Sequence, residues 1–351
     1  MIDFGRNRLF NATVDTNVII VSKEKVIDGD KPQLFYLNEK TTGKNIYEVI
    51  EKSHVGDIYL SDDAWLLNTN KFDSLKDKIE GQGLPLNKCG VNIFRGILTG
   101  CNKAYHIDTE EKNRILKKDS STQNVIKPLI CGGDTDRYYC RHSDLWLINV
   151  HNGVKGVTEP IIIDKYPVLK QRLDEYHELL VNRNDKGTTP YNLRNCAYLF
   201  EFEKEKIIWQ AISKRIAFSY DSQGYYYCDV TTYFMTGKNL KYILAILNSK
   251  LFEYTLLNIY LEGDTFKTKN SIIQNFPIPI FQKDKDERII NLVDNILTTK
   301  RNNPLADTKD IENQIDLLVY RLYGLTYDEV VIVDPETPIT REEYESQIEL
   351  V

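Results

Sequence analysis

The sequence predicts an α+β protein whose middle is rich in short strands and whose end is helical. Short runs of β-branched and aromatic residues, separated by turn residues, recur between residues 85 and 236. After Lys238 the apolar residues change to spacings of three and four, which is the period of a helix. The length of 351 residues provides for about two domains.

Residues 1–84 combine short strands with one helix. Strands are expected at 14–21, 33–37 and 57–60, because these runs are short, apolar and bounded by polar residues. A helix is expected at 71–82, where the glycines at 81 and 83 end it. We therefore expect the edge of an α/β or mixed sheet, too broken to enclose a core, and a domain boundary after residue 84.

Residues 85–280 predict a twisted, irregular β-rich domain. The expected strands are 91–98, 145–150, 196–202, 207–209, 216–220 and 225–236. A helix at 166–180 interrupts them, because Leu169, Leu173 and Leu180 fall on one helical face. Residues 93–107 predict a strand, a glycine-rich turn and a second strand.

Residues 281–351 predict a helical hairpin with an acidic tail. A helical face first runs from Leu240 to Tyr254, and the prolines of 276–280 then impose an extended segment. Two helices follow, around 289–296 and 311–322, with Asn-Asn-Pro at 302–304 as the turn between them. Residues 334–351 are acidic and predict a short extra helix or a loose tail.

Charge is distributed unevenly along the chain. The formal net charge is −6 overall, −3 for residues 1–84, +5 for 85–275 and −8 for 276–351. This composition excludes a disordered chain and a histone-like polycation, so binding to a polyanion must use a local patch. Six cysteines without a Cys-x-x-Cys pair, no apolar run of membrane-spanning length and no secretory signal predict a reduced, cytoplasmic protein without membrane contact.

The familiar motifs of catalysis are missing from this sequence. It contains no P-loop, no Gly-x-Gly-x-x-Gly, no His-Glu-x-x-His and no Gly-x-Ser-x-Gly. Cys131, Cys140 and His142 lack a usable fourth ligand for zinc and are interpreted as structural. An acidic-x-Lys pattern at 108–112 resembles part of a restriction nuclease site but lacks an upstream Pro-Asp partner. We expect no catalytic residue and no metal here.

Several segments have the chemistry of polyanion binding. The glycine-rich turn at 96–100 could offer backbone N–H groups to phosphate, although a plain hairpin turn explains it as well. Two arginines and two tyrosines lie together at 137–141, and Lys214 and Arg215 precede aromatic residues. A surface loop and simple sheet-forming residues are the alternative explanations for these segments.

In order along the chain, these segments resemble the TaqI-like C-terminal specificity region of N6-adenine DNA methyltransferases from restriction-modification and phage-defence systems. Residues 96–105 resemble its G-I-x-T-G-x-N-x-A-F opening, and 126–134 with Arg137 and Tyr138 resemble I-K-P-x-L-x-G-x-D-I-x-R-Y. Further similar segments are 191–194, 206–208, 244–251 (L-L-x-L-L-N-S-K), 276–279 (I-P-I-P) and 315–326 (I-D-x-L-V-Y-x-L-Y-G-L). Residues 2–21 resemble the last strands of the methyltransferase sheet.

The sequence departs from this family in its catalytic motifs. The family methylates with Asn/Asp-Pro-Pro-Tyr/Phe and binds S-adenosylmethionine at a glycine-rich turn, but adjacent prolines and that turn are absent here. The resemblance implies a remnant of the methyltransferase sheet at 1–84, a target recognition domain at 85–280 and a C-terminal helical hairpin at 281–351. It implies S-adenosylmethionine for the parent enzyme and no cofactor in this chain.

We therefore expect a recognition module for a specific sequence in double-stranded DNA, paired with a methyltransferase catalytic domain in cis or in trans. The expected DNA contacts are Arg95, Asn102, Lys103, Arg137, Arg141, Arg194, Lys214, Arg215, Lys267 and Lys269. Two alternatives stay open. The chain could be a specificity or docking subunit that binds a separate methyltransferase or restriction partner, or a self-sufficient methyltransferase or nuclease that lacks the usual motifs.

Overall fold

The computed structural model describes residues 2–3, 17–18, 33–36, 56–60, 65–67, 70–213, 215–260 and 270–346. The chain divides into two compact units. Met1–Gly81 with Glu262–Asp264 form the first, here called the N-terminal unit, and Gln82–Leu261 with Thr265–Val351 form the second, here called the main unit. Within the described residues, no helix combines the length and the apolar character needed to cross a bilayer.

The described part of the N-terminal unit contains a mixed sheet and a helix, as the sequence predicts. Its strands have the order β2-β1-β3-β4-β5, and β1 pairs with β3 in parallel while the other pairs are antiparallel. The elements are β1 (Ile2–Asp3), β2 (Asn17–Val18), β3 (Gln33–Tyr36), β4 (Gly56–Leu60), β5 (Trp65–Leu67) and α2 (Asn70–Gly81). Most of the strand expected at 14–21 lies outside the described residues.

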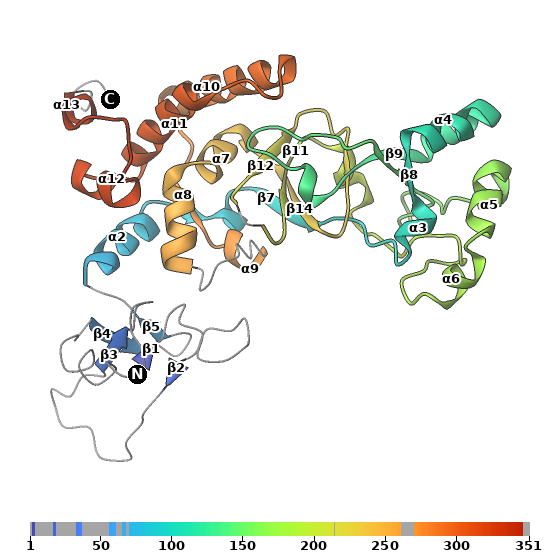
Figure 1. The fold of residues 1–351 in the computed structure, drawn as a ribbon, viewed down its shortest axis with the longest axis horizontal. Coiled ribbons are helices and arrows are strands. Elements are labelled where there is room, and N and C mark those ends of the chain that lie inside the picture. Colours follow the sequence, from blue (N-terminus) through green and yellow to red (C-terminus); the bar gives the residue numbers. More distant parts are fainter. Residues whose placement is uncertain are drawn as a thin grey trace, which may run out of the picture. The chain divides into compact units, whose positions relative to one another are not determined.

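Two four-stranded sheets form the centre of the main unit (Figure 1). The first has the antiparallel order β12-β11-β14-β7, and the second has the order β13-β9-β10-β8 with β13 and β9 parallel. The first contains β7 (Val91–Arg95), β11 (Lys206–Gln210), β12 (Phe218–Asp221) and β14 (Thr232–Gly237). The second contains β8 (His106–Asp108), β9 (Ile126–Ile130), β10 (Leu145–Ile148) and β13 (Tyr227–Cys228).

The strand-rich middle is confirmed, but two of its expected strands are wrong. Residues 196–202 do not form a strand, because a 3₁₀ turn occupies Leu199–Glu203. The two strands expected within 93–107 are present as β7 and β8, but they belong to different sheets, and the short helix α3 (Asn102–Tyr105) lies between them, so a plain hairpin is excluded. The strand expected at 225–236 is broken, because the Asp229 carboxylate accepts the Thr231 N–H at 2.9 Å and turns the chain.

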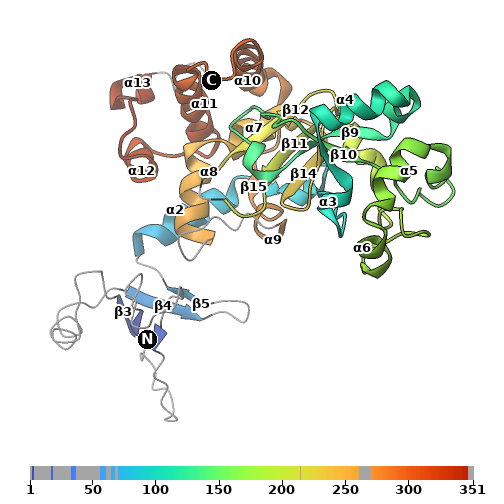
Figure 2. The same ribbon diagram turned by 45° about the vertical axis from the view of Figure 1, so that its right-hand side comes forward.

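Three helices lie beside the second sheet at one end of the main unit (Figures 1 and 2). They are α4 (Thr109–Lys118), α5 (Pro167–Asp174) and α6 (His177–Asn182). The single helix expected at 166–180 is therefore two short ones. The Asp108 carboxylate caps α4 by accepting the Glu111 N–H at 2.7 Å, and the Lys112 ammonium lies 3.6 Å from the Trp146 ring centre. These contacts give the acidic-x-Lys pattern a structural explanation.

The opposite end of the main unit is helical, and the hairpin expected there is confirmed (Figures 1 and 2). Its helices are α7 (Leu240–Leu247), α8 (Lys250–Thr255), α9 (Asn270–Ile273), α10 (Lys283–Asn302), α11 (Lys309–Leu322), α12 (Tyr327–Val333) and α13 (Arg341–Ser346). The extended Pro277–Ile278 forms β15, which pairs with β6 (Leu84–Pro85). The hairpin packs on α7 and α8, so residues 281–346 share one compact unit with the sheets.

Buried polar contacts join the helices to one another and to neighbouring strands. Asn248 is fully buried at the end of α7, and its amide accepts the Phe218 N–H at 3.0 Å and donates to the Phe218 carbonyl at 2.8 Å. Asp316 of α11 accepts the N–H of Lys250 at 2.8 Å, and the Tyr323 hydroxyl donates to the Pro277 carbonyl at 2.6 Å. These bonds satisfy backbone groups that strands and helix ends would otherwise bury unpaired.

We predict that Asn248→Leu lowers the free energy of unfolding by about 2 kcal/mol or more. The apolar side chain keeps the volume but leaves the buried N–H and C=O of Phe218 without partners. Urea denaturation followed by circular dichroism measures the change. The matched control is Asn113→Leu on the exposed face of α4, which should change stability by less than about 0.5 kcal/mol. Equal effects of the two substitutions would contradict this role of Asn248.

The buried Asp316 makes stability depend on pH in an unusual direction. Burial raises the pKa of this carboxyl from its ordinary 3.8 to about 7, although the Lys250 N–H and the Arg137 guanidinium oppose the rise. Between these two pKa values the folded chain binds more protons at this group than the unfolded chain does. This contribution therefore favours folding at low pH and is lost as the pH rises towards 7.

Asp316→Asn should remove this titration while keeping an oxygen that can accept the Lys250 N–H. We predict that the stability of the variant relative to the parent chain increases as the pH rises from about 5 to 7 and then levels off. Urea denaturation of both proteins across this range measures the difference. A difference that is constant with pH, or that falls as the pH rises, would show that the carboxyl titrates normally.

Candidate nucleic-acid interface

Close packing at one glycine and the left-handed backbone of another determine the conformation of the loop between β7 and α3. A Cβ at Gly96 would lie 1.8 Å from the Asp229 carbonyl oxygen, so only glycine fits there. Gly100 has a φ of +68°, the left-handed region that glycine adopts without strain. The Thr99 hydroxyl accepts the Cys101 N–H at 3.2 Å and donates to the Asn102 side-chain oxygen at 2.5 Å.

The buried Arg183 fixes the conformation of this loop by hydrogen bonds. Arg183 is 7% exposed, and its guanidinium donates to the Thr99 carbonyl and, at 2.7 Å, to the Tyr105 hydroxyl. The same group donates to the carbonyls of Pro190 and Asn192 at 3.0 and 2.6 Å. One cation therefore joins the loop at 99–105 to the loop at 190–192. Because its described partners are neutral oxygens, its positive charge is not cancelled by an adjacent carboxylate.

Four of the expected DNA contacts are exposed on or beside these two loops: Asn102 and Lys103 on the first, Arg194 two residues after the second, and Arg95 at the end of β7. The Arg95 guanidinium donates to the Val230 carbonyl at 3.3 Å, and Arg194 lies 3.1 Å from the Asp185 carboxylate. Lys103 projects from α3, and its backbone carbonyl accepts from Arg172 at 2.9 Å. Asn102 begins the same helix, but its side-chain oxygen is used by Thr99. Arg95, Lys103 and Arg194 remain available to a ligand.

A second group of expected contacts surrounds Asp136. Arg215 lies 3.0 Å and Arg141 lies 3.8 Å from its carboxylate, and both arginine side chains are more than half exposed. Arg137 differs, because its guanidinium forms a 2.6 Å ion pair with Glu312 of α11. Burial alone would lower the Arg137 pKa, but Glu312 raises it above the ordinary value. This ion pair joins the β-rich part to the hairpin, so it favours a structural role for Arg137 over a DNA contact.

The remaining three expected contacts are Lys214, Lys267 and Lys269, which lie outside the described residues. Their role as DNA contacts stays a prediction.

The cysteines considered for zinc are buried or half-buried thiols in the structure. Burial raises the pKa of both Cys131 and Cys140, which keeps these thiols protonated. In the part of the chain that the structure describes, no three or more His, Cys, Asp or Glu side chains form a group suited to a metal.

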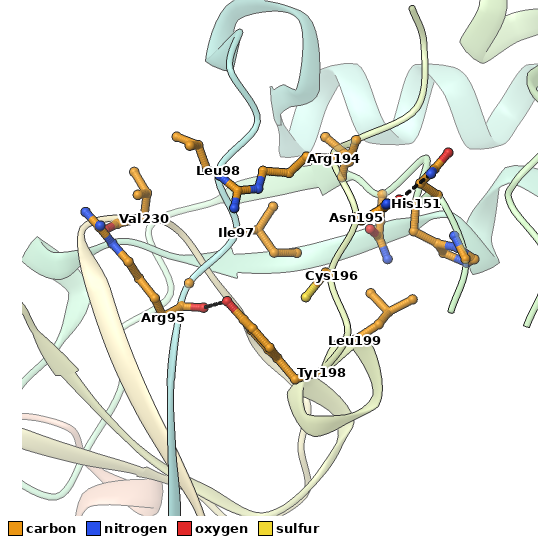
Figure 3. Close-up of a pocket in the computed structure, with 15 residues that line it drawn as sticks. Arg95, Ile97, Leu98, His151, Arg194, Asn195, Cys196, Tyr198, Leu199 and Val230 are labelled. Atoms are coloured by element: carbon orange, nitrogen blue, oxygen red, sulfur yellow. Dashed lines mark hydrogen bonds between the residues drawn. The ribbon is translucent and has the colours of Figure 1, made fainter. Parts of the chain in front are cut away.

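The sequence analysis missed a cavity of about 180 Å³ between the end of β7 and residues 193–199 (Figure 3). Its lining extends from the buried Asn149, Leu193 and Leu199 to the exposed Arg95 and Arg194. Ile97, His151, Asn152, Asn195, Cys196 and Tyr198 also line it. The sequence contains two clusters of amide side chains, at 149–152 and 192–195. These clusters were the sequence pattern that could have indicated the cavity.

Two residues of this cavity have a defined hydrogen-bonding role. His151 Nδ1 accepts the Gly153 N–H at 3.1 Å, which leaves the proton on Nε2. Burial and the nearby Lys127 lower the pKa of His151, so the ring is neutral at pH 7. The Tyr198 hydroxyl donates to the Arg95 carbonyl at 3.1 Å, a bond visible in Figure 3. The cavity wall is thus tied directly to the strand end that carries Arg95.

A buried ion pair fixes the tyrosine-rich loop at 222–227. Lys206 is fully buried, and its ammonium lies 2.6 Å from the Asp221 carboxylate and 2.7 Å from the Phe202 carbonyl. The same carboxylate accepts the N–H groups of Tyr225 and Tyr226 at 3.1 and 2.8 Å. The tyrosines are therefore positioned by the fold, and the Lys206 segment noted in the sequence is part of the core.

Comparison with known proteins finds similar proteins for part of the chain. Residues 127–278 match the TaqI-like C-terminal specificity domain family. The type II methyltransferase M.MjaIV of Methanocaldococcus jannaschii is 23% identical over 242 residues, covering 64% of this chain and 76% of that protein.

Two solved structures share similarity with the chain. The type IIL restriction-modification enzyme MmeI, in complex with DNA, has a TM-score of 0.54 at 15% identity, covering 76% of this chain and 37% of that chain. The type IIG restriction endonuclease BpuSI has a TM-score of 0.43 at 14% identity, covering 73% and 33%. The chain therefore spans about a third of the length of these structures. Residues 127–278, less than half of the chain, are thus similar to the TaqI-like C-terminal specificity domain, and the chain shares its fold with the type IIL enzyme.

Proposed function

We propose that this chain recognises a specific sequence in double-stranded DNA for an adenine-N6 methyltransferase of a restriction-modification system. The observation that carries the proposal is the exposed cationic group of Arg95 at the end of β7, Lys103 on the segment that the buried Arg183 holds, and Arg194 just after the loop at 190–192. Phosphate contacts by lysine and arginine provide most of the affinity of such proteins, and side chains aimed at base edges provide the specificity. The family match and the relative of methyltransferase type support the same function.

The sequence contains no glycine-rich strand-to-helix turn of the kind that binds S-adenosylmethionine in the family that it resembles. The sequence also lacks the Pro-Pro motif that would hold a flipped adenine. We therefore assign methyl transfer to a catalytic domain that acts in cis or in trans, and assign no catalytic residue to this chain.

The proposed contacts predict a specific change in salt dependence. Arg95→Gln combined with Arg194→Gln should weaken binding to duplex DNA of any sequence, because both charges face phosphate. The slope of log K against log salt should become less steep by about 2, since each phosphate contact contributes close to 0.9. Fluorescence anisotropy of a labelled duplex, measured from low to moderate salt, gives the slope.

The matched control removes two exposed charges from α10 by Lys285→Gln and Arg288→Gln. These residues lie at the helical end, so the slope should stay within error of the parent chain. If the control pair flattens the slope and the Arg95 and Arg194 pair does not, the DNA lies on the helical hairpin instead. If the parent chain shows no salt-dependent binding to duplex DNA, the docking function is favoured over DNA recognition.

A further inference from the structure

The main unit contains a second hollow, here called the tyrosine groove, that plays no part in the proposed duplex contacts. Three parts of the chain line it: residues 138–140, the loop that follows β12, and the C-terminal turns of α10. Its volume is about 390 Å³, within the range of roughly 300–1,000 Å³ that is usual for ligand sites. Aromatic rings dominate the lining, which includes Tyr139, Tyr220, Tyr225 and Tyr226. A groove of this size and composition is suited to a flat ligand.

The tyrosine groove lies at the edge of the first sheet that is opposite to Arg95. The strand order is β12-β11-β14-β7, the groove includes Tyr220 and Asp221 of β12, and Arg95 ends β7. Neighbouring strands are spaced by about 4.8 Å, so the two edge strands are roughly 14 Å apart. The groove therefore offers a ligand a second surface of the main unit.

The backbone of the tyrosine-rich loop is fixed before any ligand binds. The Asp221 carboxylate, which is paired with the buried Lys206, accepts the N–H groups of Tyr225 and Tyr226. Tyr225 is nevertheless 52% exposed, and its ring centre lies 5.0 Å from that of the half-buried Tyr226. Because a fixed backbone presents these rings, a ligand can bind them with little loss of conformational freedom.

Three hydroxyl groups of the groove have no hydrogen-bond partner in the part of the chain that the structure describes. They belong to Tyr139, Tyr225 and Tyr226, whereas the Tyr220 hydroxyl donates to the Glu205 carboxylate. Burial raises the pKa of Tyr226 to about 12, so this hydroxyl remains a donor at neutral pH. The groove can therefore donate hydrogen bonds to a ligand that carries acceptor atoms.

The lining of the groove also contains one positive charge that no neighbour cancels. Its charged residues are Asp221 and Arg301, and Asp221 is paired with Lys206. Arg301 is exposed in the last turn of α10 and forms no ion pair with another described residue. Exposed rings, hydroxyl donors and a cation match the base, the acceptor atoms and the phosphate of a nucleotide.

The kind of nucleic acid follows from the exposure of the bases. In a duplex the faces of each base are covered by its neighbours, so a tyrosine stacks on a base only where the strand is unpaired. Proline-rich peptides also dock in grooves lined by aromatic residues. The uncancelled charge of Arg301 favours the strand, because polyproline carries no side-chain charge and each nucleotide carries a phosphate.

We propose that the tyrosine groove binds single-stranded nucleic acid, with a base stacked on Tyr225 and a phosphate in contact with Arg301. The inference goes beyond the proposed recognition of duplex DNA, since it uses none of Arg95, Lys103 and Arg194. DNA and RNA strands offer the same stacking and phosphate chemistry, so the experiment has one arm for each.

Fluorescence anisotropy of the full chain measures binding to a labelled oligothymidylate and a labelled oligouridylate of about ten nucleotides, a length that spans one such site. Tyr225→Leu should weaken binding roughly tenfold, the effect of losing one stacked base, whereas Tyr225→Phe keeps the ring and should stay within about twofold. Phe200→Leu is the matched control, because it removes a ring that is 42% exposed outside the groove, and it should leave the affinity unchanged.

Arg301→Gln tests the phosphate contact. The slope of log K against log salt should become less steep by about 0.7, the contribution of one phosphate of a single strand. Arg288→Gln removes an exposed charge from the same helix outside the groove and should not change the slope. Tyr225, Phe200, Arg288 and Arg301 are all exposed, so we expect each variant to fold, and circular dichroism verifies this.

Weaker binding of Tyr225→Leu together with the flatter slope of Arg301→Gln supports the proposal, and the arm that shows both effects identifies DNA or RNA. Absence of single-strand binding, or failure of either effect in both arms, overturns it. Binding of a labelled decaproline peptide that Tyr225→Leu abolishes, without binding of either strand, overturns it in favour of a protein partner. Single-strand binding that depends on Arg95 and Arg194 but not on Tyr225 overturns it as well. None of these failures affects the proposed duplex recognition, which the Arg95 and Arg194 variants test on paired DNA.

Discussion

The surface that we assign to DNA depends on one buried guanidinium, that of Arg183. A lysine could not replace it, because only the planar fork of arginine reaches the carbonyls of Thr99, Pro190 and Asn192 and the Tyr105 hydroxyl together. By joining the segment at 99–105 to the loop at 190–192, it fixes the segments that carry Lys103 and lead to Arg194. Its own charge, facing neutral oxygens, adds to the positive potential of that surface.

Most of the motifs that resemble the TaqI-like family belong to the scaffold. Asn248 satisfies the backbone of β12, Asp316 binds the first N–H of α8, and the Tyr323 hydroxyl binds the Pro277 carbonyl. Such residues identify the domain because the fold requires them, and they carry no information on a DNA sequence. Base recognition must then come from side chains on the loops, where substitutions leave the scaffold unchanged.

The sequence revealed the order of elements better than the pairing of side chains. The helical period after Lys238 and the short apolar strands are local patterns, and both proved reliable guides to the fold. Contacts between residues far apart in the sequence produce no such local pattern. Arg137 pairs with a glutamate 175 residues away, so its charge could not be recognised as internal. The two strands within 93–107 were predicted, but not that β7 and β8 pair with partners elsewhere in the chain and so belong to separate sheets.

The most direct test of the central claim is hydrogen–deuterium exchange of the full chain with and without an arbitrary DNA duplex. Amide protons close to bound DNA exchange more slowly, and this readout requires neither a substitution nor knowledge of the target sequence. The account predicts protection of the peptides that cover residues 95–103 and 192–196, with little change in α10 and α11. Protection confined to the helical hairpin, with the loops around Arg183 unaffected, would contradict it.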